Sequence, residues 1–122
     1  MKWLTHAIAS ERRALERARR RFVSKPTEER LHEVRTKGRR FRSLLEDVAD
    51  LAPLKRLHRR VKRAAAATDA ARDATIVLRL LEDALDASEA EIAAPLIEQL
   101  RGQERLATGR ARKELRRMRF LP

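Results

Sequence analysis

Arginines at helical spacing are the side chains in this chain that are best suited to chemistry. On a helix that turns about 100° per residue, four basic or titratable residues fall within roughly 80° of one another and form one ridge: His32, Arg35, Arg39 and Arg42. The planar guanidinium of arginine can hold two oxygens of one phosphate, whereas lysine acts as a point charge. This ridge therefore predicts a site for phosphate groups.

A second basic ridge lies near the end of the sequence. At the same rotation per residue, five arginines share a face: Arg101, Arg105, Arg112, Arg116 and Arg119. Gly109 interrupts them and is expected to let a ligand or a neighbouring helix approach the backbone. Both ridges border the apolar stripe of their helix, which favours binding. The alternative, two solvated faces laced with intrahelical ion pairs, stays open.

Charge and composition narrow the class of protein. Thirty Lys and Arg against eighteen Asp and Glu leave a net charge of +12, and such a field draws in anions. The lack of cysteine excludes disulfides and thiol nucleophiles. The acidic pairs at 46–47 and 82–83 are interpreted as solvated, and the sequence contains neither a phosphate-binding glycine loop nor an HExxH motif. We expect a binding protein without enzymatic activity, cofactor or metal.

The location of the protein is also predicted from what the sequence contains. No apolar run approaches the ~20 residues that a membrane-spanning helix needs. The first residues have no long apolar stretch of the kind found in a signal peptide. We therefore expect a cytoplasmic protein that does not bind a membrane.

The elements that must position these residues are predicted to be helices throughout. Ala, Leu, Arg and Glu dominate the 122 residues, and this composition favours an all-α fold with one core, in a single domain over residues 1–122. Apolar periodicity predicts helices over about residues 3–23, 27–51, 54–85 and 88–120. The third is expected to be one long helix despite Thr68-Asp69. The fourth is expected to begin at a capping box formed by Ser88 to Glu91, with a kink or a late start at Pro95.

Four amphipathic helices with short connections predict an antiparallel four-helix bundle with long helices. The core is expected to take the apolar stripe of every helix, including Val77, Leu81 and Leu96. Trp3 and the three phenylalanines are also assigned to the core, because none of them interleaves with the basic ridges as a base-stacking platform would.

Two segments resemble the hallmarks of a known family. The segment 31–43 resembles the signature helix of the CHAD family, the conserved histidine α-helical domain, in which arginine at +3, a basic pair at +7 and +8 and arginine at +10 follow a histidine. The matching residues are His32, Arg35, Arg39, Arg40 and Arg42. The segment 70–78 resembles the second hallmark, an Arg-Asp dipeptide, here Arg72-Asp73, that opens an apolar run. Asp69 stands where that family usually has a glycine.

The resemblance implies an all-helical domain that binds inorganic polyphosphate in a basic groove or channel and associates with polyphosphate granules. Family members usually contain two four-helix halves, and this chain is long enough for one. We therefore predict that two copies form a homodimer, and that polyphosphate, phosphate or sulfate strengthens it. The resemblance implies six binding residues, and the second ridge adds three more: His32, Arg35, Arg39, Arg40, Arg42 and Arg72, then Arg105, Arg112 and Arg116.

Two other functions remain open at this point. A basic helical protein also suits nucleic acid in a chromatin-like role, and arginine ridges on a convex surface would favour that reading. A scaffold protein would bury the ridges against an acidic partner. Ridges that line a groove would favour polyphosphate.

Overall fold

The chain is α-helical throughout the part that the structure describes. The structure is a computed structural model, and it describes residues 2–48 and 52–121. Within these residues there are five α-helices and no strand. The prediction of an all-α fold is confirmed. The helices are α1 (Lys2–Ser24), α2 (Glu28–Asp47), α3 (Ala52–Ala84), α4 (Ala87–Ile92) and α5 (Ala94–Arg117).

The first two helices meet at the predicted turn. Thr27 caps α2, because its side-chain oxygen accepts a hydrogen bond from the backbone N–H of Arg30. Glu28 and Glu29 stand in the first turn, where the helix dipole favours negative charge. The helix α2 ends at Asp47 with Val48 as its C-cap, and residues 49–51 of its predicted extent lie outside the described residues.

The third helix is continuous, as predicted. The Thr68-Asp69 pair lies inside α3 without a break. The hydroxyl of Thr68 donates to the carbonyl of Ala65 at 2.8 Å, so this side chain bonds back to its own helix.

The predicted fourth helix is divided into two helices, and its start was wrong. Asp86, not Ser88, caps α4, and Asp86 and Glu89 accept hydrogen bonds from each other's backbone N–H. A second helix, α5, begins at Ala94 with Pro95 in its first turn, where the missing N–H is not needed. The expected late start at Pro95 is confirmed.

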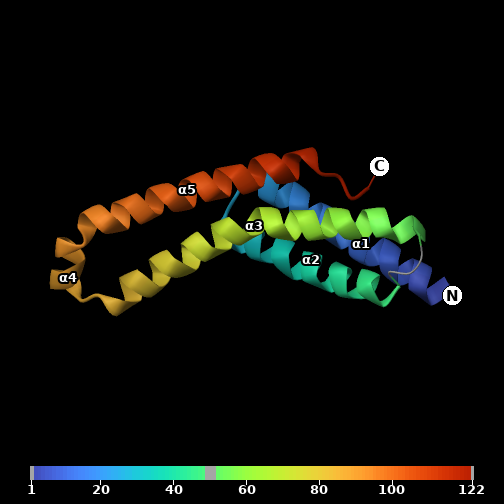
Figure 1. Cartoon of the computed structure of the whole chain (residues 1–122), viewed down its shortest axis with the longest axis horizontal. Helices are drawn as coiled ribbons and strands as arrows, with labels where there is room; N and C mark the ends of the chain where they lie inside the picture. Colours follow the sequence, from blue (N-terminus) through green and yellow to red (C-terminus); the bar gives the residue numbers. More distant parts are fainter. Residues whose placement is uncertain (1, 49–51, 122) are drawn as a thin grey trace.

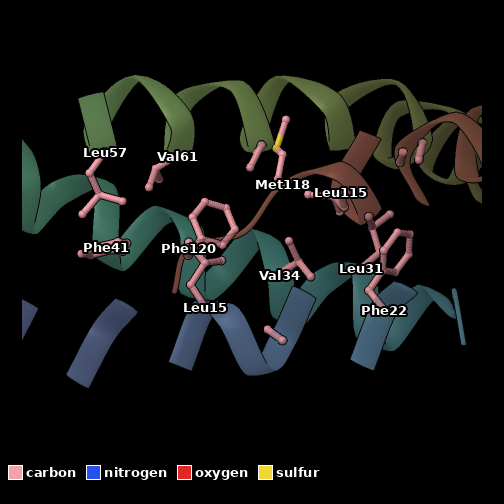
Figure 2. Close-up of a cluster of buried hydrophobic side chains, with 14 of the residues drawn as sticks. Leu15, Phe22, Leu31, Val34, Phe41, Leu57, Val61, Leu115, Met118 and Phe120 are labelled. Atoms are coloured by element: carbon pink, nitrogen blue, oxygen red, sulfur yellow. The ribbon is translucent and has the colours of Figure 1, made fainter. Parts of the chain in front are cut away.

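Four long helices surround the core in one half of the molecule. The helix α1 contacts α2 and α5, and α3 contacts the same two helices (Figure 1). Large side chains from all four helices meet between them (Figure 2). The fully buried ones include Leu15, Phe22, Phe41, Leu45, Val61 and Leu115.

The four-helix arrangement does not extend along the whole molecule. With 33 residues, α3 is about 50 Å long, whereas the 20 residues of α2 span about 30 Å. The end of α3, α4 and the beginning of α5 therefore project beyond α1 and α2 as a two-helix hairpin (Figure 1). The prediction that Val77 and Leu96 belong to the core was wrong, because they are 51% and 49% exposed on this hairpin.

The end of the chain is extended, not helical. The helix α5 stops at Arg117, and Met118 has extended backbone angles. An extended segment turns alternate side chains to the same side, so Met118 and Phe120 enter the core (Figure 2). Arg119 between them is exposed. The predicted end of the helix at residue 120 was wrong for this reason.

The assignment of Trp3 to the core was wrong. Its side chain is 70% exposed, whereas Leu4 is buried. Adjacent helical residues differ by about 100° in direction, so only one of the two can face the core. The three phenylalanines are fully buried, as predicted.

Candidate functional site

Two neighbouring pockets lie between α2 and α3, with volumes of about 250 and 340 Å³. Arg35 and Arg39 line both pockets, so the two adjoin each other, and together they are called here the α2–α3 groove. Six Lys and Arg side chains and one histidine line it: His32, Arg35, Arg39 and Arg42 from α2, and Lys62, Arg72 and Arg79 from α3.

The α2 side of the groove is the predicted ridge. Leu31, Val34, Phe41 and Leu45 are buried, and the ridge stands beside this stripe and lines the groove between α2 and α3. His32 is exposed, and its Nε2 lies 3.5 Å from the hydroxyl of Thr36. All four residues of the ridge therefore lie along one groove.

The α3 side contributes cations that the sequence analysis only partly identified. Arg72 lines the second pocket together with Arg79, which lies two helical turns later and pairs with Glu28. Lys62 lines the first pocket. Arg79 and Lys62 were missed. The seven-residue spacing from Arg72 was a signal for Arg79, but Lys62 is found only once the face of α3 toward α2 is known.

Acidic side chains neutralise part of the positive charge of the groove. Arg35 donates to Asp69 at 2.8 Å, and Arg42 donates to Glu46 at 3.0 Å. The hydrogen bond from Arg42, with a smaller contribution from His58, holds the pKa of the Glu46 carboxyl below its usual value. Arg39 and Arg72 are exposed and have no hydrogen bond or ion pair with any described residue. Together with Lys62 they are the cations of the groove that have no partner among the described residues.

Arg40 lies on another side of α2. It is exposed and lines neither pocket of the groove. On the helix it is rotated by about 140° from Arg35. The structure therefore does not bring Arg40 together with the other residues that the family resemblance implies.

The arginines of α5 do not line the groove either. Arg105 pairs with Glu98 of its own helix, and Arg112 donates to the carbonyl of Val23 at 2.8 Å. Arg116 is exposed. The ridge of α5 and the ridge of α2 are thus separate surfaces. Gly109 was expected to permit close approach, but a Cβ there would meet nothing within 4 Å.

Two further features bear on the site. No group of three or more His, Cys, Asp or Glu residues in the described part of the chain is arranged to hold a metal ion. Among the described helices, none is both long and apolar enough to cross a membrane.

Comparison with known proteins adds one finding. A family model described as the CHAD domain matches residues 6–122. The match includes every residue that lines the α2–α3 groove. No curated protein and no solved structure matches the chain.

Proposed function

Because the chain belongs to the CHAD domain family, we propose that it binds inorganic polyphosphate in the α2–α3 groove and that it acts as a binding domain, not as a catalyst. The observation that supports this most is the adjacency of the two pockets: Arg35 and Arg39 line both of them. Among the described residues, six Lys and Arg side chains and only two acidic side chains, Glu28 and Asp69, line the groove. A linear polyanion can therefore meet cations along the whole length.

Binding follows from the placement of cations on both walls. From residue 32 to residue 42 the ridge of α2 extends for about 15 Å, so several phosphates of one chain meet successive side chains. Arg39 and Arg72 are free to bind first, because no described carboxylate occupies them. Charge-assisted hydrogen bonds to phosphate are about twice as strong as neutral ones. Release of condensed counterions adds to the affinity.

The size of the groove favours polyphosphate over duplex nucleic acid as the ligand. Its two pockets have volumes of about 250 and 340 Å³, a size for a thin chain and not for a double helix. A cytoplasmic location and association with polyphosphate granules belong to the same proposal. The exposed arginines of α5 are the surface on which the nucleic-acid alternative would depend.

A competition experiment tests the function. Labelled inorganic polyphosphate is bound to the protein at physiological salt and displaced with unlabelled polyphosphate or with duplex DNA of equal charge. We expect polyphosphate to compete at far lower concentration. Equal competition by DNA would contradict the proposal.

A matched pair of variants tests the site. Arg39→Ala removes a cation of the groove, and Arg17→Ala removes an exposed arginine of α1 that lines neither pocket. Each lowers the net charge by one, so nonspecific attraction changes equally. We expect Arg39→Ala alone to weaken binding by about tenfold, the effect of one strong charge-assisted hydrogen bond. Equal losses for the two variants would place the polyanion outside the groove.

A further inference from the structure

The carboxylate of Asp69 stands in the groove beside Arg35, which lines both pockets. Asp69 is the only acidic residue that lines the first pocket in the described part of the chain. Its Oδ1 accepts a hydrogen bond from Nη1 of Arg35 at 2.8 Å. Arg35 lines both pockets, so this ion pair lies in the path of any chain that passes from one pocket to the other.

The two side chains of this ion pair differ in their exposure and in how firmly other contacts hold them. The side chain of Arg35 is only 16% exposed, whereas that of Asp69 is 59% exposed. Nη1 of Arg35 also donates to the hydroxyl of Thr68 at 2.8 Å, and Thr68 is fully buried. Arg35 is therefore held in place by a partner other than Asp69. The Asp69 carboxylate can rotate into solvent without releasing the arginine.

We propose that Asp69 is an internal competitor for the polyanion, and that its carboxylate lowers affinity by occupying Arg35 and by repelling phosphate in the first pocket. This inference rests on the proposed function, because it concerns the same groove. A phosphate oxygen at Arg35 would replace the carboxylate oxygen at the same guanidinium. Two like charges held a few ångströms apart at a protein surface repel each other appreciably, so a bound chain would displace Asp69. Binding would then exchange one anion for another at Arg35, while Arg39 and Arg72 gain a partner outright.

Competition from Asp69 is also expected to affect free phosphate and long phosphate chains differently. A single phosphate ion gains little by replacing a carboxylate at one arginine. A long chain gains contacts at several cations for the same displacement, because its later contacts are intramolecular. Asp69 therefore favours chains over free phosphate.

The test is the substitution Asp69→Asn, which keeps the shape of the side chain and removes its charge. The control is Asp83→Asn, because Asp83 is exposed on the same helix, lines neither pocket and changes the net charge equally. Fourteen residues separate the two, which is about 21 Å along the helix and more than the screening length of about 8 Å at physiological salt. Affinity for a polyphosphate of defined length is measured by titration at fixed salt, with circular dichroism as the check on folding.

We expect Asp69→Asn to tighten binding by about 5- to 30-fold and Asp83→Asn to leave it within about twofold. Most of the gain should be lost when Arg35→Ala is added, because the competition at that arginine is then absent and only the repulsion of phosphate by Asp69 remains. Equal affinity of Asp69→Asn and Asp83→Asn would overturn the competitor while leaving the proposed function in place. Weaker binding by Asp69→Asn would also overturn it and would make Asp69 a positioning residue for Arg35. No binding by any form would reject the proposed function itself.

Discussion

The carboxylate of Glu16 holds the guanidinium of Arg19 inside the bundle, at 2.9 Å and with both side chains under a tenth exposed. Arg19 also donates to the carbonyl of Leu115, and Glu16 accepts the backbone N–H of Phe120 at 3.3 Å. The ion pair thus connects α1 to the end of α5 and to the extended segment that follows it.

Removing one member of this pair is expected to destabilise the fold strongly. Glu16→Gln leaves the charge of Arg19 buried without a counterion, and such changes cost about 3–5 kcal/mol. The free energy of unfolding is measured in denaturant. The control is Glu114→Gln on the exposed face of α5, where we expect a change within about 0.5 kcal/mol. A Glu16 variant as stable as the control would contradict the role of the pair.

Neighbouring arginines of α2 should differ in their effect on binding. Arg39 lines both pockets, and Arg40 lines neither. We expect Arg39→Ala to weaken polyphosphate binding severalfold more than Arg40→Ala, with both measured by titration at the same salt. Circular dichroism of both variants should match the native protein, because both side chains are exposed. A larger loss for Arg40→Ala would show that the ligand contacts the outer face of α2.

Affinity for polyphosphate should fall steeply with salt. If four to six of the groove cations each displace condensed counterions, the affinity drops by about 10²- to 10³-fold between about 50 and 200 mM salt. Titrations over this range give the slope directly. Arg39→Ala should reduce the slope by about one counterion. A slope near zero would rule out the electrostatic mechanism.

Gly109 is a site where stability is expected to increase. It is exposed inside α5, and a Cβ there would have nothing within 4 Å. Alanine is better than glycine in a helix by about 0.5–1 kcal/mol, because glycine loses more backbone entropy on folding. Thermal unfolding of Gly109→Ala should show a higher midpoint with unchanged polyphosphate affinity. A lower midpoint would mean that the backbone at Gly109 needs the freedom of glycine.

We expect the predicted homodimer to form through the projecting hairpin. On α3 and α5, Val77, Leu80, Leu96 and Leu106 are 49% to 65% exposed, and none of them lines the α2–α3 groove. Two copies of a chain with a net charge of +12 repel each other, so self-association needs an apolar contact apart from the basic groove. We predict a dimer through this hairpin that polyphosphate or sulfate strengthens by reducing the repulsion.

Light scattering with and without the anion measures this self-association. Leu80→Glu places a charge in the apolar surface and should abolish the dimer. Ser10→Glu on α1 changes the net charge equally on an exposed residue outside the hairpin and should not. A monomer under all conditions, or equal behaviour of the two variants, would exclude the hairpin as the interface.

The sequence alone determined the local features of this protein. Periodicity places α1, α2 and the unbroken α3, because each helix shows its buried stripe in its own residues. It also places His32, Arg35, Arg39 and Arg42 on one ridge beside the core, since residues three and four apart share a helix face.

The tertiary structure decided which residues from different helices meet. The pairing of α2 with α3 sets Lys62 and Arg79 opposite the ridge and sets Asp69 on Arg35, whereas the α5 arginines remain apart. The buried pair of Glu16 and Arg19 looks in the sequence like any exposed i, i+3 pair. The different lengths of α2 and α3 leave Val77 and Leu96 half exposed. A periodic pattern reports the direction of a side chain on its own helix, and the packing of helices against one another decides what that side chain meets.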